Sequence, residues 1–200
     1  MKKVLLVAAA VAVLAWPVAA QQTFSPDAEG FIRNWLVLAP IPMAGQSGAE
    51  EIDVEFIKGE GTLKPSADAE VKLPGGTLKW QAHQTFADYI DFRESFDKNA
   101  GEYVIGYAVT YVVAEAPMNV TLAVGTNDQG KVWFNGKEVV RFPDTRVLDK
   151  DADKVPVSLV KGTNVLVMKV INEVNSWQAC ARFLNGTTPV TNVKVSLTPQ

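Results

Sequence analysis

The fold is decided by residues 120–140, VTLAVGTNDQGKVWFNGKEVV, in which short apolar runs alternate with turn residues. Asn135-Gly136 is a pair that two-residue type I′ hairpin turns favour, because both central positions of that turn need a positive φ. The runs on either side, 131–134 and 137–142, therefore predict an antiparallel hairpin. Upstream, residues 126–130 (TNDQG) supply a turn that separates this hairpin from an earlier strand.

Outward from this stretch, apolar alternations continue, separated by turns at intervals of about eight to twelve residues. This spacing predicts an antiparallel β-sandwich or barrel. Residues 165–171 are apolar at nearly every position, which is expected of a central strand covered on both faces. Further strands are expected at 103–113, 120–124, 155–159, 178–184 and 192–197.

The first half of the chain has a less regular pattern. A strand is expected over 31–38, ended by Pro40 and Pro42, because proline lacks the N–H that a strand ladder needs. A short helix is expected within 49–57, and two short strands around the turn Pro74-Gly75-Gly76. No internal repeat or long linker divides the sequence, which predicts a single domain.

The first residues have the pattern of an export signal. Two lysines precede an apolar stretch, residues 4–16, that is too short to span a bilayer, and Val18-Ala19-Ala20 places small residues at its end. Residues 1–20 are therefore predicted to be a cleaved secretory signal, and residues 21–200 one domain, secreted or periplasmic. No later stretch has the roughly 20 apolar residues of a membrane helix, so no membrane insertion is expected after cleavage.

Composition excludes several classes of protein. The 19 basic residues are outnumbered by 22 acidic ones, and without the two lysines of the leader the net charge is −5. This charge argues against nucleic acid and other polyanions as partners, and leaves neutral ligands and cations open. One Cys and one His cannot form an intrachain disulfide, a Cys-rich zinc site or a multi-His metal centre.

Four parts of the later sequence jointly carry a resemblance to a known family: residues 120–140, residues 155–170 (VPVSLVKGTNVLVMKV), Trp177 and Arg182-Phe183. They resemble the galactose-binding-like jelly-roll domains that are attached to many bacterial secreted glycosidases. Residues 35–42 and 59–80 are similar to the entry region of the same group, so the resemblance covers nearly the whole chain after the leader. It implies a single antiparallel jelly-roll β-sandwich with at most one or two short helices, and a role like that of a carbohydrate-binding module.

The loops of this chain depart from the commoner pattern of that group. Residues 126–130 stand where Ser-Asp-Asp-Gly is usual, and residues 175–178 (NSWQ) stand where a Gly-rich loop with a Trp is usual. Since both departures lie in loops, the resemblance indicates the fold more closely than the ligand.

Strand parity indicates which loops can cooperate. If the strands from Tyr103 onward run alternately up and down, the loops at 126–130, 143–154 and 172–177 share one end of the sandwich. This end collects amides, carboxylates, an arginine and a tryptophan, which suit sugar hydroxyls and the apolar face of a pyranose. The candidate ligand-binding residues are Asn127, Asp128, Arg146, Asn175 and Trp177.

Structural alternatives stand beside these assignments. Trp177 immediately precedes a predicted strand, so packing in the mouth of the sandwich is its alternative. For Asp128 the alternative is a turn in which the side chain bonds its own backbone. The turns at the opposite end of the sandwich hold mostly Gly, Pro and Thr, and they supply no candidate.

Asp149, Asp151 and Asp153 alternate along one loop, as oxygen ligands do around a hard cation such as calcium. The loop lacks the glycine and the distal glutamate of an EF-hand, and a solvated turn is the alternative. The resemblance permits a structural calcium without locating it, and no cofactor is expected to be required.

Enzymatic signals are weak. Residues 45–49 (GQSGA) approach the nucleophile-elbow pattern, but the motif ends in Ala and has only His83 available as a base. The sequence therefore predicts an exported, non-catalytic binding module whose partner is a carbohydrate, either a polysaccharide or a glycan. One alternative is a structural subunit that docks on another exported protein, and a hydrolase is a third.

Overall fold

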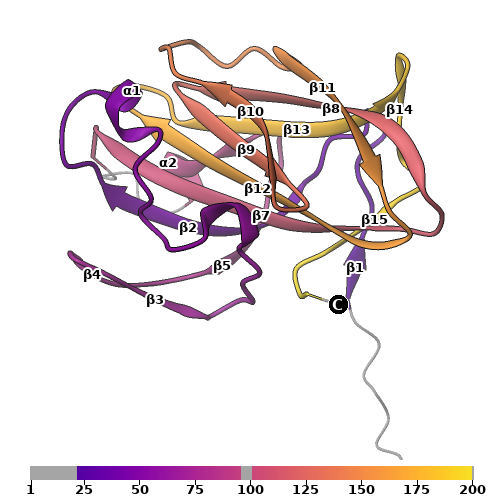
Figure 1. The fold of residues 1–200 in the computed structure, drawn as a ribbon, viewed down its shortest axis with the longest axis horizontal. Helices are drawn as coiled ribbons and strands as arrows, with labels where there is room; N and C mark the ends of the chain where they lie inside the picture. Colours follow the sequence, from indigo (N-terminus) through magenta and orange to yellow (C-terminus); the bar gives the residue numbers. More distant parts are fainter. Residues whose placement is uncertain (1–21, 96–100, 200) are drawn as a thin grey trace, which may run out of the picture.

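The computed structural model describes residues 22–95 and 101–199, and two antiparallel sheets face each other in it (Figure 1). The prediction of an all-β sandwich is confirmed. The predicted secretory signal, residues 1–20, lies outside the described residues. None of the helices in the described part is long and apolar enough to cross a membrane.

Sheet A is the larger sheet and holds eight strands. They are β1 (Thr23–Phe24), β2 (Asn34–Pro42), β5 (Gln81–Gln84), β7 (Val104–Ala114), β9 (Gly130–Phe134), β10 (Lys137–Phe142), β12 (Gly162–Asn172) and β15 (Lys194–Ser196). Their order is β1-β15-β7-β12-β9-β10, and β2 pairs with both β7 and β5. Strand β10 is therefore a free edge of this sheet.

Sheet B holds five strands, and a separate hairpin and three short helical turns complete the described chain. The strands are β6 (Ile90–Asp91), β8 (Met118–Asn127), β11 (Asp153–Leu159), β13 (Gln178–Asn185) and β14 (Thr188–Pro189). Their order is β11-β8-β13-β14, with β6 also beside β13, so β11 is a free edge. The remaining elements are β3 (Glu70–Leu73), β4 (Gly76–Lys79), α1 (Gly48–Glu51), α2 (Phe92–Ser95) and the 3₁₀ turn η1 (Glu60–Thr62).

The predicted hairpin forms where the sequence places it. Asn135 and Gly136 have φ values of 50° and 82°, as a type I′ turn requires. The Asn135 side chain also accepts a hydrogen bond from the backbone N–H of Val165 at 2.8 Å, which fixes the turn against β12. Strand β12 pairs with β7 on one side and β9 on the other, so its prediction as a central strand is confirmed.

The first half of the chain corrects two expectations. Strand β2 begins at Asn34 and continues through Pro40 to its last residue, Pro42, so Pro40 does not end it and the strand extends beyond the expected residue 38. The physical reason is that β2 pairs with β5 only as far as Val37, so the proline-containing part has a partner on one side alone and the missing N–H groups cost little. The helix expected within 49–57 is a single turn, α1.

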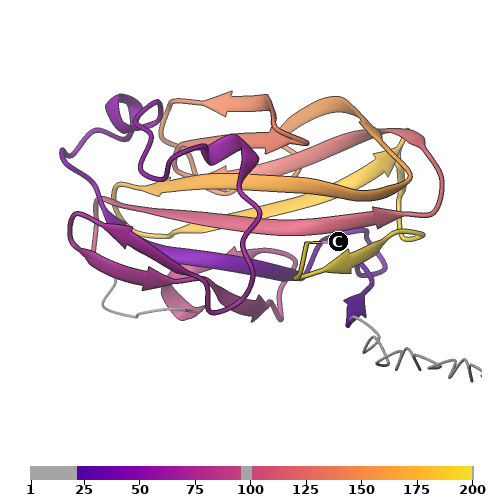
Figure 2. The ribbon, with the colours of Figure 1, turned by 60° about the horizontal axis from the view of Figure 1, so that its bottom comes forward.

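Two apolar cores lie on opposite faces of sheet A. The first fills the space between the sheets, and the second lies under the segment from α1 to β4, which crosses the outer face of sheet A (Figure 2). Lys169 of β12 is fully buried in this second core, where its Nζ donates to the backbone carbonyls of Glu51, Ile52 and Val54. Tyr107 of β7 donates its hydroxyl to Glu60 beside it.

Candidate functional site

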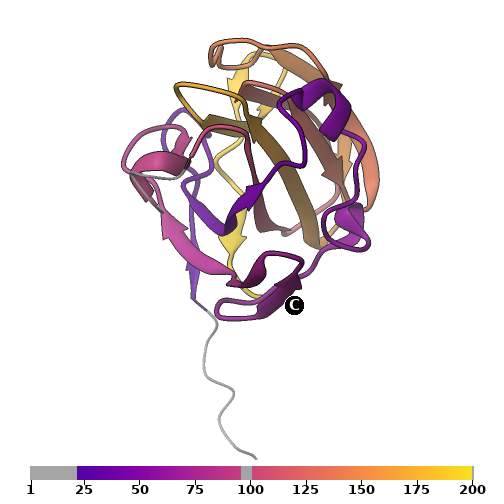
Figure 3. The same cartoon turned by 90° about the vertical axis from the view of Figure 1, so that its left-hand side faces the viewer.

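The three loops that strand parity groups together do meet at one end of the sandwich, which we call the loop end (Figure 3). Arg146 Nε donates to the backbone oxygen of Thr126 at 3.1 Å, and the N–H of Glu173 donates to Asp128 Oδ2 at 3.0 Å. These bonds join all three loops, so their predicted convergence is confirmed.

The loop end is closed by its own polar groups. The Glu173 carboxylate accepts bonds from the N–H of Gly48 at 2.7 Å and from Gln129 Nε2 at 2.9 Å, which ties α1 to the loops. Asn127 and Asp128 are only 6% and 7% exposed. Burial raises the pKa of the Asp128 carboxyl, and the nearby Glu173 carboxylate adds to the rise. The amides and carboxylates expected to bind a ligand are therefore used mainly to hold the loops together.

Some hydrogen-bonding capacity is left over inside this end. Among the described residues, the buried oxygens Asn127 Oδ1, Gln129 Oε1 and Glu51 Oε2 have no hydrogen-bond partner. All three atoms are acceptors. They lie beneath the loops rather than on an open surface, since each side chain is 6% exposed or less.

Trp177 lies in the first core. Its ring has no exposed surface, stacks on Phe92 with the ring centroids 4.7 Å apart, and donates its N–H to the Val170 carbonyl at 3.2 Å. A Cβ on Gly106 would come within 2.8 Å of both rings, so β7 approaches them closely. The structure thus corrects the expectation of a sugar platform at Trp177, because neither face of the ring is available to a ligand.

The other predicted ligand residues divide between structural and exposed positions. The Arg146 guanidinium lies 3.6 Å from the centre of the Phe142 ring and pairs with Asp153 at 2.5 Å. Asn175 is exposed at the tip of its loop with a φ of 67°. Arg146 thus fixes the 143–152 loop, and Asn175 is the one residue of the predicted set that faces solvent.

The three aspartates proposed as calcium ligands do not converge. Asp151 receives two bonds from Arg182, at 2.9 and 2.5 Å, and Asp153 is paired with Arg146. Asp149 is exposed. Within residues 22–95 and 101–199, no group of three His, Cys, Asp or Glu side chains could hold a metal ion. The calcium expectation at these residues is therefore corrected, because two of the carboxylates are neutralised by arginines.

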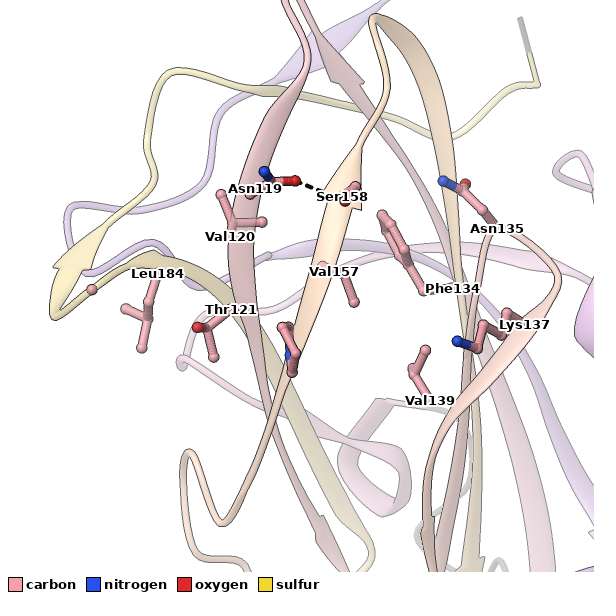
Figure 4. Close-up of a pocket in the computed structure, with 12 residues that line it drawn as sticks. Asn119, Val120, Thr121, Phe134, Asn135, Lys137, Val139, Val157, Ser158 and Leu184 are labelled. Carbon is pink, nitrogen blue, oxygen red and sulfur yellow. Dashed lines mark hydrogen bonds between the residues drawn. The ribbon is translucent and has the colours of Figure 1, made fainter.

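An open cleft of about 600 Å³ lies at the opposite end, between the free edges of the two sheets (Figure 4). We call it the edge cleft. Residues of β8, β11, the β9–β10 hairpin and the β13–β14 turn line it: Asn119, Val120, Thr121, Phe134, Asn135, Lys137, Val139, Pro156, Val157, Ser158, Leu184 and Gly186. Its volume is in the range of ligand sites, about 300–1,000 Å³.

The edge cleft has an apolar floor and a polar rim. Val120, Phe134 and Val157 belong to the core between the sheets and are 7%, 5% and 9% exposed. On the rim, Ser158 Oγ donates to Asn119 Oδ1 at 2.8 Å across the pair β8 and β11, where these two residues face each other. Figure 4 shows Lys137 and Val139 on the opposite side of the cleft, on the hairpin.

Two further depressions adjoin the edge cleft. One of about 520 Å³ shares Thr121, Pro156, Leu184 and Gly186 with it, and one of about 500 Å³ shares Asn119 and Val120. The hollow surface therefore continues beyond the cleft in two directions. An extended ligand suits this shape better than a small molecule that needs to be enclosed.

Sequence reasoning grouped the turns of this end correctly but did not identify a site there. Asn119 and Asn135 had the appearance of turn residues, and the floor residues are ordinary members of apolar alternations. One sequence feature could have indicated this site: Asn, Ser and Thr residues recur near the turns at this end of the sandwich. A scan of protein-family models finds none that matches this chain, and a search of curated proteins finds no match either.

Proposed function

We propose that this protein is an exported, non-catalytic binding module that holds a carbohydrate in the edge cleft. The observation that carries the proposal is the combination of an apolar floor, formed by Val120, Phe134 and Val157, with amide and hydroxyl groups on the rim. Sugars present the same combination, with apolar C–H faces and vicinal hydroxyls. The resemblance to galactose-binding-like domains and the leader-like residues 1–20 support the same proposal.

The proposal places the ligand away from the loops that the sequence favoured. At the loop end Asn127 and Asp128 are buried and Glu173 is bonded to Gly48 and Gln129. Asn119 and Ser158 bond to each other but are exposed on the cleft rim. Open polar groups beside apolar surface bind sugar with little reorganisation of the protein, so less of the binding free energy is lost.

Affinity electrophoresis of the purified protein through gels that contain single polysaccharides tests this proposal. The variant Ser158→Trp places a large ring on the rim of the cleft at an exposed strand position, and Thr77→Trp is the matched control on the exposed hairpin β3–β4. Retardation by a polymer that S158W abolishes and T77W retains is the expected result. If S158W does not unfold cooperatively, Asn119→Trp on the facing strand replaces it. Retardation by no polymer, or retardation that both cleft variants retain, would overturn the proposal.

A second candidate function is docking on another exported protein. The observation in its favour is that two free edge strands, β10 and β11, flank the cleft. Free edges can pair with a strand of a partner. Both edges carry features that oppose such pairing, however: Pro156 lies in the middle of β11, and β10 has a register shift between Glu138 and Val140. The carbohydrate proposal is therefore the better supported one.

The two candidates differ in how binding responds to substitution. A stable protein interface buries about 1,200 Å² or more. Docking through such an interface is expected to fail when several of its apolar residues are substituted. Sugar binding in the edge cleft depends on a few rim groups. A panel of single substitutions at the rim that each weaken binding to a polysaccharide favours the first function.

A further inference from the structure

We infer that the edge cleft selects an anionic polysaccharide, whose sugar units carry carboxylates or sulfate esters. This inference rests on the proposed function and adds the chemical class of the ligand. It differs from the expectation drawn from net charge, because it depends on where the charges lie rather than on their sum.

The distribution of charge around the cleft is the first step. None of the described residues that line the edge cleft is an Asp or a Glu, and Lys137 is among them. Lys154 lines the adjoining depression that shares four residues with the cleft. Lys64 lines a third depression, which shares Asn135 with the cleft. In a chain with 22 acidic residues, the charged side chains that line these three depressions are mainly basic: Lys64, Lys137, Lys154 and Arg182 against Asp151 alone.

The carboxylates close to this surface do not neutralise the lysines. Asp151 is the one acidic residue that lines the adjoining depression, and it is bonded through both oxygens to Arg182. Glu115 belongs to the turn between β7 and β8 and lines none of the depressions described above. Lys161, in the turn between β11 and β12, adds another positive charge at the same end.

Lys137 and Lys154 are also unpaired. Both are exposed, and within the described residues neither side chain forms an ion pair or a hydrogen bond. Some other lysines have carboxylate partners: the exposed Lys79 pairs with Glu70, and Lys150 pairs with Asp88. The positive charges at the cleft thus remain available to a ligand.

The chemistry of the rim defines the ligand class. Asn119 and Ser158 supply groups for sugar hydroxyls, and an ammonium group on each flank supplies a charge-assisted bond to an anionic substituent. The open, continued shape of the depressions suits a chain of such sugars. A neutral polymer would offer these ammonium groups no charge-assisted bond.

The test compares acidic polymers with their neutral counterparts. The probes are polygalacturonate with its carboxyl-reduced form, and dextran sulfate with dextran, so that the two arms distinguish carboxylate from sulfate. The variant is Lys137→Gln/Lys154→Gln, and the control with the same change in net charge is Lys58→Gln/Lys72→Gln, two exposed lysines that do not line these depressions. Dissociation constants are measured at low and at physiological salt.

The expected result is that at least one acidic polymer binds about tenfold or more tightly than its neutral counterpart, and that K137Q/K154Q removes most of this preference while K58Q/K72Q retains it. Equal binding of acidic and neutral polymers, blocked by S158W, would leave the carbohydrate function standing and overturn this inference. Equal loss in both double variants would overturn it as well, because the effect would then be one of net charge. Binding to no polymer would contradict both proposals.

Discussion

Lys169 Nζ lies 3.3 Å from Glu60 Oε1 in the second core, and the two side chains are 0% and 7% exposed. The ammonium also donates to three backbone carbonyls of residues 51, 52 and 54, at 3.1, 3.2 and 2.6 Å. One lysine of the central strand β12 therefore holds the segment that crosses sheet A. Burial lowers the pKa of Lys169, and the Glu60 carboxylate opposes that effect.

Replacing Lys169 with Met is expected to reduce the free energy of unfolding by about 3–5 kcal/mol, because it leaves Glu60 buried without a cationic partner. The double variant Lys169→Met/Glu60→Gln is expected to recover part of this loss, since it removes the unpaired charge. Urea denaturation measures both values. A loss below about 1 kcal/mol in K169M would show that the ion pair does not hold this segment.

Trp177→Ala is expected to reduce the free energy of unfolding by about 3–5 kcal/mol, as large-to-small changes at buried aromatic positions do. The cause is the loss of the stacked contact with Phe92 and of the bond to the Val170 carbonyl. Thermal unfolding followed by circular dichroism checks the value. A variant that keeps wild-type stability but loses ligand binding would instead restore Trp177 as a ligand residue.

Local patterns predicted the elements that depend on local chemistry. The Asn135-Gly136 turn requires two positive φ values, and residues 165–171 of β12 are apolar at every position except Lys169, so short stretches of sequence were sufficient in both cases. The predicted end of β2 was wrong, because the effect of a proline in a strand depends on whether a second strand lies beside it. That neighbour is remote in sequence.

The candidate site was less predictable than the fold, for a related reason. Strand parity brought the correct loops together, but the bond from Gly48 to Glu173 that closes the loop end joins residues 125 positions apart. The edge cleft arises because β10 and β11 are the free edges of different sheets. Neither fact follows from the periodicity of any one segment, because both depend on how the sheets are ordered.

Calcium is expected to leave the thermal stability unchanged. The carboxylates of Asp151 and Asp153 are occupied by Arg182 and Arg146, so a cation would have to displace a guanidinium from each. Thermal unfolding of the purified protein with added calcium and with a chelator measures the effect. A rise in Tm of several degrees with calcium would indicate a metal site that this arrangement does not provide.

Titration of Cys180 is expected to lower the free energy of unfolding at alkaline pH. The thiol is 2% exposed on β13, and burial raises its pKa from 9.0 to about 12, with a smaller contribution from the Asp151 carboxylate. Since the pKa is higher in the folded than in the unfolded protein, the stabilisation from the protonated thiol is complete below about pH 9 and is lost as the pH rises toward about 12.

The variant Cys180→Ala isolates this contribution, because alanine has no group that titrates there. Between about pH 8 and about pH 10.5, the free energy of unfolding of the wild type should fall by about 2 kcal/mol more than that of C180A. The buried tyrosines Tyr107 and Tyr111 also have raised pKa values, but they titrate in both proteins and cancel in the difference. Equal pH slopes for the two proteins, or rapid alkylation of Cys180 in the folded protein at about pH 8, would show that the thiol is more accessible than its 2% exposure implies.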